Sequence, residues 1–222
     1  MTTEKIFIIG AAGHAKVIID IVEKQKKYSI VGLIASKAEQ GHIIMGYTVI
    51  GTEDDLPQLM LEHPNSKLLI AIGDNWTRYK VYERVKSLLN NVEYATAIHP
   101  SAQIGKGVTM GQGSVVMAGA ILNSDSNIGD FSIINTKASI DHDNTIGNFT
   151  SVAPNVTCGG NVTIGDFTAI SISATIKHGI HIGTHTVIGA GSIVLTDVAD
   201  YIVAYGIPAK RIRTRVQGEK YL

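Results

Sequence analysis

Three segments of the chain, each beginning eighteen residues after the last, read IDHDNTIG (140–147), CGGNVTIG (158–165) and IKHGIHIG (176–183). In each, an apolar residue at the first position is followed six residues later by Ile-Gly. Continued in steps of six, the pattern covers seventeen consecutive positions from Ile98 to Val194, all apolar. If about half of all positions were apolar, such a run would arise roughly once in a hundred thousand trials. The period therefore reflects the fold.

A six-residue period matches neither the 3.6 residues of a helical turn nor the two-residue alternation of a strand. It is typical of a short strand followed by a corner, and three such units close one triangular coil of eighteen residues. Glycines spaced by eighteen, as stacked corners require, are Gly111, Gly129, Gly147, Gly165 and Gly183. These hexapeptides resemble those of left-handed β-helices. We therefore expect that fold, with the aliphatic residues and Cys158 filling its interior.

The amino-acid composition of the repeat differs from that of the rest of the chain. Residues 98–199 hold only nine charged side chains, with no Arg or Glu, and 14 of the 23 glycines. The first 97 residues alternate between strand and helix patterns, which predicts a Rossmann-like α/β domain with a small parallel sheet. The expected strands are 5–9, 29–35 and 67–72, and the expected helices are 14–26, 52–61 and 74–89. We thus predict an α/β domain at 1–97, a left-handed β-helix at 98–199 and a C-terminal tail at 200–222.

Charge and hydropathy exclude several classes of protein. Nineteen basic and nineteen acidic side chains give a net charge of +0, which argues against a nucleic-acid-binding protein. No run of about 18 apolar residues exists, so we expect no membrane span. The single cysteine forms no internal disulfide, and a cytoplasmic protein is the simplest expectation. No metal site is expected.

One outward-facing ladder of the expected β-helix carries chemistry. Side chains eighteen apart stack about 4.8 Å apart, so Ser124, His142, Gly160 and His178 form one column. Gly160 would leave bare backbone between two histidines about 10 Å apart. His142 suits a general base because its ordinary pKa lies near neutrality, and Asp143 would orient it if a corner bends the chain there. The alternative for either histidine is a solvated surface residue.

Two features of the α/β domain have both a functional and an ordinary interpretation. The turn from Gly10 to His14 follows a strand and opens a helix, so its N–H groups are placed to hold an anion, although a simple tight turn has the same pattern. Asp74, Asn75 and Arg78 suit a helix cap and the exposed first turn of that helix.

The motifs GAAGHAKV (10–17), AIGDN (71–75) and YGIPAK (205–210), together with the His142-Asp143 array, resemble those of bacterial sugar acetyltransferases. That family includes sialic acid O-acetyltransferases and nucleotide-aminosugar N-acetyltransferases, and the resemblance covers nearly the whole chain. It implies a homotrimer that binds acetyl-CoA in the groove between two subunits and holds the sugar in the N-terminal domain.

The resemblance also implies residue roles. His142 corresponds to the general base, Asp143 to its acidic companion, and Gly160 to the backbone donor to the thioester carbonyl. The implied cofactor contacts, besides Gly160, are Ser151, Ile172, Ala190, Pro208 and Lys210. Arg211, Arg213 and Arg215 are, with Lys210, candidates for the CoA phosphates; for Arg213 and Arg215 the alternative is a solvated basic tail or a trimer contact. The implied substrate contacts are Ala12, Gly13, His14, Gly73 and Asn75. The spacing of eighteen places Pro154, Ile172, Ala190 and Pro208 on a second ladder, and the resemblance implies that Ile172 and Ala190 lie along the cofactor.

The chain departs from the family at one point. Relatives that bind a nucleotide-linked sugar commonly carry an acidic pair after the second strand, where this sequence has Ala35-Ser36. We predict an acetyl-CoA-dependent N-acetyltransferase acting on a nucleotide-linked 4-amino-deoxysugar for surface glycan synthesis. The alternatives are a sialic acid O-acetyltransferase, which Ala35-Ser36 mildly favours, and a non-catalytic β-helix scaffold.

Overall fold

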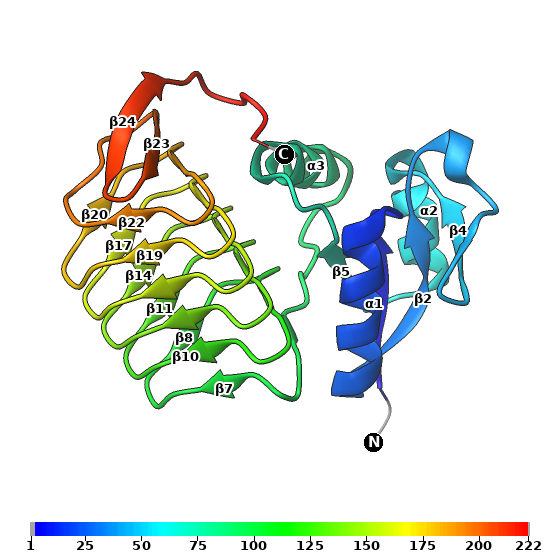
Figure 1. Cartoon of the computed structure of the whole chain (residues 1–222). Coiled ribbons are helices and arrows are strands. Elements are labelled where there is room, and N and C mark those ends of the chain that lie inside the picture. Colours follow the sequence, from blue (N-terminus) through cyan, green and yellow to red (C-terminus); the bar gives the residue numbers. More distant parts are fainter. Residues whose placement is uncertain (1–2, 222) are drawn as a thin grey trace.

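The computed structural model describes residues 3–221, which form an α/β part and a β-helix lying side by side (Figure 1). The sheet of the α/β part has the order β3-β4-β2-β1-β5 and is parallel except for the β3-β4 pair. Its elements are β1 (Glu4–Ile9), α1 (Gly13–Gln25), β2 (Tyr28–Ile34), β3 (Ile43–Ile44), β4 (Tyr47–Gly51), α2 (Leu56–Glu62), β5 (Lys67–Ile70) and α3 (Asn75–Leu88). The predicted α/β fold is confirmed.

Both faces of this sheet are covered, which explains the continuous apolar run of β1. Ile6 and Ile8 pack with α1 on one face, whereas Phe7 and Ile9 pack with α2 and α3 on the other. The antiparallel pair β3-β4 was not expected from the sequence, because its strands are short and only partly buried. The helix expected at 52–61 begins instead as a 3-10 turn at Glu53–Asp55.

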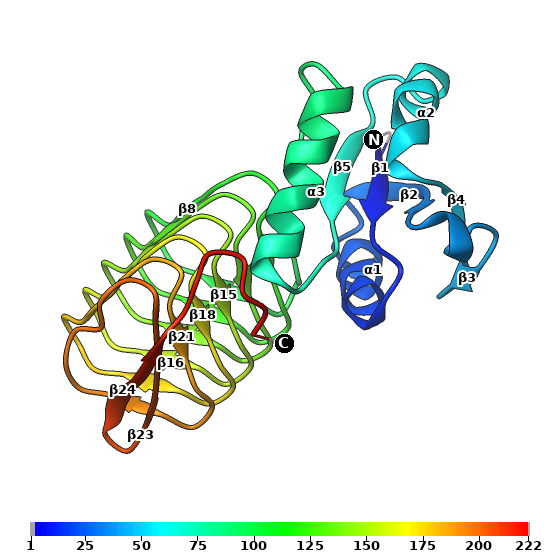
Figure 2. The ribbon, with the colours of Figure 1, turned by 90° about the horizontal axis from the view of Figure 1, so that it is seen from above.

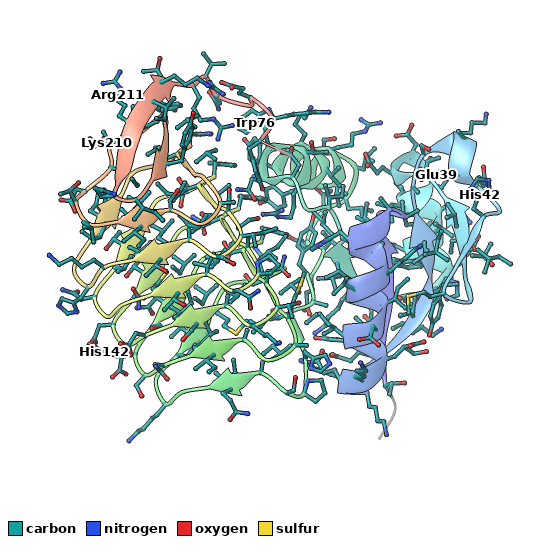
Figure 3. All side chains as sticks on the ribbon, in the orientation of Figure 1. Glu39, His42, Trp76, His142, Lys210 and Arg211 are labelled. Carbon is teal, nitrogen blue, oxygen red and sulfur yellow. The ribbon has the colours of Figure 1, made fainter. Side chains whose placement is uncertain are left out.

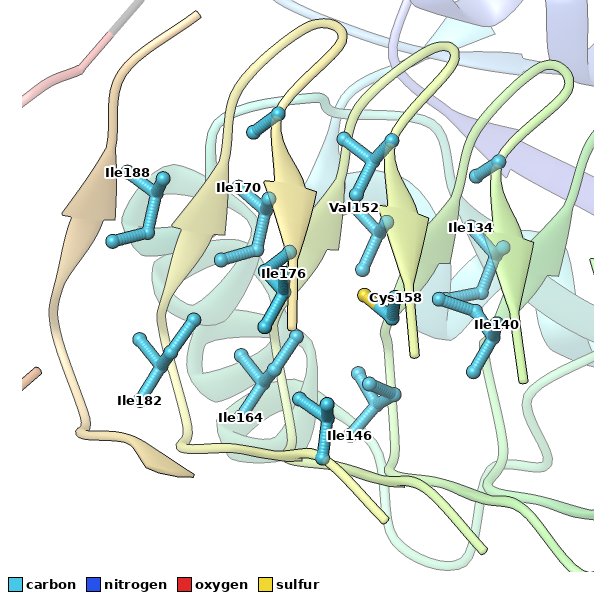
Figure 4. Packing of buried hydrophobic residues seen from close by; sticks show 14 of the residues in the cluster. Ile134, Ile140, Ile146, Val152, Cys158, Ile164, Ile170, Ile176, Ile182 and Ile188 are labelled. Carbon is cyan, nitrogen blue, oxygen red and sulfur yellow. The ribbon is translucent and has the colours of Figure 1, made fainter. Parts of the chain in front are cut away.

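The β-helix stacks two-residue strands into three parallel sheets, and residues eighteen apart pair between coils, as Ile140 does with Cys158. The apolar six-residue positions face inward and fill the interior (Figure 4). The strands are β6 (Ala97–Ile98), β7 (Gln103–Ile104), β8 (Thr109–Met110), β9 (Val115–Val116), β10 (Ile121–Leu122), β11 (Asn127–Ile128), β12 (Ile133–Ile134), β13 (Ser139–Ile140), β14 (Thr145–Ile146), β15 (Ser151–Val152), β16 (Thr157–Cys158), β17 (Thr163–Ile164), β18 (Ala169–Ile170), β19 (Thr175–Ile176), β20 (His181–Ile182), β21 (Val187–Ile188) and β22 (Ile193–Val194).

A column of stacked aromatic rings joins the two parts. It consists of Phe131, Phe149, Phe167, His185 and Tyr201, whose consecutive ring centroids are 4.6 to 5.4 Å apart. Helix α3 lies beside the β-helix (Figure 2). Its aromatic rings pack against this column, in part edge-on. The α/β part is thereby held against one corner of the β-helix.

The last coil is two residues short. Ile182 pairs with Val198 and Ile188 with Ala204, both sixteen residues on. The same register sets Gly206 above Ala190, so the ladder expected to reach Pro208 is wrong. Pro208 instead lies in the turn of an antiparallel hairpin formed by β23 (Ile202–Gly206) and β24 (Ala209–Thr214).

After β24 the chain returns to α3 (Figure 1). Within residues 3–221, no helix has the length and apolar character needed to cross a membrane.

Candidate active site

His142 lies at the corner between β13 and β14, where the backbone of Asp143 takes a left-handed conformation with φ of 58°. The bend brings two adjacent side chains together, so that the Nδ1 of His142 lies 2.7 Å from the Oδ2 of Asp143. The Asp141 carboxylate accepts the backbone N–H of His142 and the side-chain amide of Asn123, at 2.9 and 3.0 Å. The bend that the pairing of His142 with Asp143 requires is therefore present at this corner.

These carboxylates set the protonation of the imidazole. The hydrogen bond to Asp143, and then the charge of Asp141, raise the pKa of His142 above its ordinary value. Both members of the His142-Asp143 pair are about half exposed, with 52% and 59% of their side chains accessible. His142 can therefore exchange a proton with a ligand, while Asp143 stabilises the charged ring that results.

Gly160 lies directly above His142, since the Asn161 N–H donates to the His142 carbonyl at 2.9 Å. A Cβ at position 160 would lie only 2.6 Å from the Nε2 of His142, so the missing side chain makes room for the ring. Within residues 3–221, the Gly160 N–H donates to no protein acceptor. An available N–H thus lies next to the basic nitrogen.

His142 and His178 lie closer than their positions on the ladder suggest. Their ring centroids are 6.4 Å apart instead of about 10 Å. Because Gly160 lacks a side chain, the two rings lean toward one another across the intervening coil.

A second group of expected residues lines a cavity of about 470 Å³ between the α/β part and the β-helix, which we call the seam cavity. Gly13, His14 and Gly73 come from the α/β part, and Ser151, Ile172 and Ala190 come from the β-helix. The rest of the lining is mostly apolar; it consists of Val17, Ile133, Asn135, Ala153, Pro154, Ala169, Ile170, Ser171 and Tyr221. The seam cavity suits a ligand with both apolar and hydrogen-bonding groups.

His14 is the unsatisfied polar group of this cavity. Its Nε2 is buried and, among the described residues, has no hydrogen-bond partner. Burial, and then the nearby charge of Arg78, lower the pKa of His14 to about 4. His14 is therefore a neutral hydrogen-bonding group near neutral pH.

Asn75 and Arg78 have structural roles that differ from those expected. Asn75 is buried; its side-chain amide donates to the Thr168 carbonyl at 3.0 Å, and its side-chain oxygen accepts Ser151 Oγ at 2.6 Å. Arg78 is fully buried instead of lying on the surface, and donates to the carbonyls of Phe131, Ile72 and Gly73. The Asn75 side chain therefore joins α3 to the β-helix, and the substrate contact expected of Asn75 stays a prediction.

Asp74 caps α3 as expected, its side chain accepting the Thr77 N–H at 2.9 Å.

Ala12 lies apart from the seam cavity. It lines a cavity of about 790 Å³ at the carboxyl ends of the parallel strands, which we call the strand-end cavity. Ala35 and Ser36 line it too. Ser36 donates its hydroxyl to Glu39 at 2.6 Å, so a carboxylate lies at this rim although positions 35 and 36 carry none.

The cations of the tail divide into two groups. Lys210 and Arg211 are exposed on β24 and line a cavity of about 360 Å³. Arg213 pairs with the Glu219 carboxylate, and the buried Arg215 donates to the Glu219 carbonyl. Arg213 and Arg215 are thus held by internal contacts instead of forming a free basic tail.

One chain does not bring all of these residues together. His142 lies on the edge of the β-helix that faces away from the α/β part (Figure 3). The seam cavity lies on the other side, against α1 and the loop after β5. Pro208 and Lys210 lie on the hairpin at the end of the β-helix.

Sequence reasoning missed Tyr221. Its ring lines the seam cavity and its hydroxyl donates to the Gly73 carbonyl at 3.2 Å. No periodic pattern extends into the tail, so its return to α3 had no sequence signal.

Comparison with known proteins gives a consistent set of similarities. A family model described as the PglD N-terminal domain matches residues 5–85. PerB from Caulobacter crescentus, solved in complex with CoA and GDP-perosamine, is 34% identical with a TM-score of 0.87, over 96% of this chain and 99% of that chain. The acetyltransferase domain of PglB from Neisseria gonorrhoeae, in complex with acetyl coenzyme A, is 31% identical with a TM-score of 0.86, over 95% and 100% of the two chains.

A curated relative is similar over a shorter stretch. The UDP-N-acetylbacillosamine N-acetyltransferase of Bacillus subtilis is 33% identical over 118 residues, which is 52% of this chain and 52% of that protein. The match spans about half the length of this relative.

Proposed function

The chain belongs to the bacterial nucleotide-aminosugar N-acetyltransferases, and we propose that it transfers the acetyl group of acetyl-CoA to the amine of a nucleotide-linked 4-amino-deoxysugar. The observation that carries the proposal is the His142 corner. There an imidazole with a carboxylate on Nδ1 lies against a glycine whose N–H is unused within the described chain. Acyl transfer to an amine needs a base and an oxyanion donor at one point.

The chemistry follows from these positions. As the sugar nitrogen attacks the acetyl carbonyl, His142 Nε2 accepts the proton that the nitrogen loses. The Gly160 N–H stabilises the developing oxyanion, a contribution of about 3 kcal/mol in comparable sites. The C–S bond then breaks, the amide forms, and His142 returns the proton to the CoA sulfur. Cys158 takes no part as a nucleophile, because it is buried and burial raises the pKa of its thiol to about 12.

The proposed reaction site also involves a second copy of the chain. His142 and the seam cavity lie on different edges of one β-helix, so we propose that the cavity of one subunit faces the His142 corner of the next in a homotrimer. Acetyl-CoA would then lie in the groove between two subunits. The exposed Lys210 and Arg211 suit its phosphates.

The strand-end cavity is the proposed place of the nucleotide. It lies where parallel α/β sheets commonly bind such ligands, beside the turn of Gly10 to Ala12. Glu39 and Glu53 supply carboxylates for ribose hydroxyls or base N–H groups in place of the acidic pair that Ala35-Ser36 lacks.

The test is an assay of free-thiol release from acetyl-CoA with a panel of nucleotide-linked aminosugars, with NMR of the product. We expect an amide product and a fall in kcat of at least about a hundredfold for His142→Ala. No transfer to any acceptor, or full activity of His142→Ala, would refute the proposal. An ester product from sialic acid would support the O-acetyltransferase instead, and failure to bind acetyl-CoA would support a scaffold.

A further inference from the structure

We propose that Tyr221 is a specificity-determining residue of the seam cavity, which the C-terminal strap (residues 215–221) brings into contact with the acceptor sugar. The inference rests on the proposed function and extends it to a segment outside the motifs of the α/β part and the β-helix. The strap runs from the hairpin to α3 (Figure 1). Tyr221, near its end, lines the seam cavity.

The strap is fixed at its start. The Arg215 N–H donates to the Tyr201 carbonyl at 2.8 Å, and the Arg215 guanidinium donates to the Glu219 carbonyl. The Glu219 carboxylate accepts Arg213 at 2.5 Å and the Val216 N–H at 3.2 Å. These contacts close residues 213–219 into a compact turn, so the path of the chain beyond it is directed.

The strap then crosses α3 at close range. Gly218 has φ of 77°, and a Cβ at this position would lie 2.6 Å from the Nε1 of Trp76. Trp76 in turn packs against the aromatic column at Phe167, with ring centroids 5.5 Å apart. Both the backbone conformation and the space therefore require glycine here, and the strap is seated against α3, which begins two residues after Gly73 of the seam cavity.

Tyr221 completes the wall of the cavity. Its hydroxyl reaches the Gly73 carbonyl, which also accepts Arg78 at 2.9 Å. Burial raises the pKa of Tyr221, so its hydroxyl stays protonated near neutral pH. Because its proton is donated to the Gly73 carbonyl, its oxygen is the atom that can accept a hydrogen bond from a sugar hydroxyl. Apart from the backbone, few groups of this mostly apolar cavity can bind a sugar hydroxyl; His14, Tyr221 and Ser151 are among them.

The chemistry of a tyrosine suits the acceptor. Its ring presents an apolar face to the C–H groups of a deoxysugar, while its hydroxyl binds a ring substituent. A site that binds a substrate hydroxyl discriminates strongly against an analogue that lacks it. We therefore expect Tyr221 to select among acceptor sugars, with little effect on acetyl-CoA.

The experiment compares Tyr221→Phe and Tyr221→Ala with Lys220→Ala, a matched change at an exposed strap residue outside the seam cavity. The KM for the aminosugar and the KM for acetyl-CoA are measured separately, together with acceptor binding by calorimetry and the melting temperature. We expect Tyr221→Ala to raise the acceptor KM roughly tenfold or more, and Tyr221→Phe to raise it less, with the KM for acetyl-CoA unchanged. Lys220→Ala should match the wild type.

The outcomes separate the two proposals. If the wild type transfers acetyl groups and Tyr221→Ala and Tyr221→Phe leave the acceptor KM and acceptor binding unchanged, only the role of Tyr221 is refuted. A rise confined to the KM for acetyl-CoA would also refute it, since the ring would then contact the cofactor. A wild type that neither binds nor acetylates any aminosugar overturns both proposals. If Tyr221→Ala has a lowered melting temperature, Tyr221→Phe, which keeps the ring, decides whether Tyr221 contacts the acceptor.

Discussion

His142 and His14 show how surroundings move the protonation of the same side chain in opposite directions. His142 is exposed beside two carboxylates, which raise its pKa, whereas His14 is buried beside the guanidinium of Arg78, which adds to the effect of burial in lowering its pKa. The first can therefore take up and release a proton near neutral pH, and the second remains a neutral hydrogen-bonding group. Their proposed roles as base and as sugar contact agree with this difference.

For His142, Asp143→Asn should shift the pH profile of kcat/KM. The base works only when neutral, so activity falls as the pH drops through the pKa of His142. Removing the carboxylate that raises this pKa moves the fall to lower pH and lowers the maximal rate by about tenfold or more, because the imidazolium loses its partner. The profile is measured from acetyl transfer between about pH 5 and pH 9. Asp141→Asn removes the smaller of the two causes that raise the pKa of His142, so it should shift the pH profile less. An unshifted acidic limb of the profile in Asp143→Asn would contradict the assignment of His142 as the base.

For His14, the prediction concerns stability. Its pKa of about 4 in the folded protein lies below the ordinary 6.5, so the unfolded chain binds the proton more readily. The stability associated with the neutral ring is present above about pH 6.5 and is lost as the pH falls toward 4, by up to roughly 3 kcal/mol. Urea unfolding of the wild type and of His14→Gln at both pH values measures the difference. Equal pH dependence of the two proteins would show that His14 titrates normally.

At the level of elements, the six-residue period was sufficient to predict the β-helix, its register of eighteen and the position of Gly160 above His142. The predicted strands and helices of the α/β part were also largely correct, because parallel strands covered on both faces leave continuous apolar runs. The short last coil was missed because the ladder was continued in steps of eighteen, although the apolar run stops at Val194 and the chain pairs sixteen residues on. The burial of Arg78 and Asn75 was missed because it depends on contacts between α3 and the β-helix.

The aromatic column gives a prediction at this level. Phe149 stacks on Phe131 and Phe167 and meets Tyr79 of α3 edge-on, with ring centroids 5.3 Å apart. Phe149→Ala should reduce the free energy of unfolding by about 3 to 5 kcal/mol, as large-to-small changes in a packed core do. Lys137→Ala, an exposed corner residue that shares the left-handed backbone conformation, is the control and should cost little. Urea unfolding measures the free energy of unfolding of both variants. Similar decreases in the two would mean that stability depends on the corner conformation and not on the ring stacking.

At the scale of the whole molecule, the two halves of the proposed site lie on opposite sides of one chain. The α/β part occupies one side of the β-helix and forms the seam cavity, which leaves the His142 edge uncovered (Figure 3). In the proposed homotrimer, a complete site exists only between two copies of the chain. Closed symmetric assembly makes every such contact equivalent.

Mixing two inactive variants tests this arrangement. His142→Ala removes the base, and Gly13→Phe fills the seam cavity; a Cβ at position 13 meets no atom within 4 Å, so the substitution has room without disturbing the fold. Each variant alone should be inactive. In a randomly mixed oligomer, a contact works when an intact cavity from one copy faces an intact His142 from another, which holds for about a quarter of contacts. The doubly tagged fraction contains no trimers of a single variant, and each mixed trimer has one working contact in three. Co-expression with two affinity tags should therefore recover roughly a third of wild-type activity in that fraction. Recovery of the two tags together without activity would place the base and the cavity of each site in the same chain.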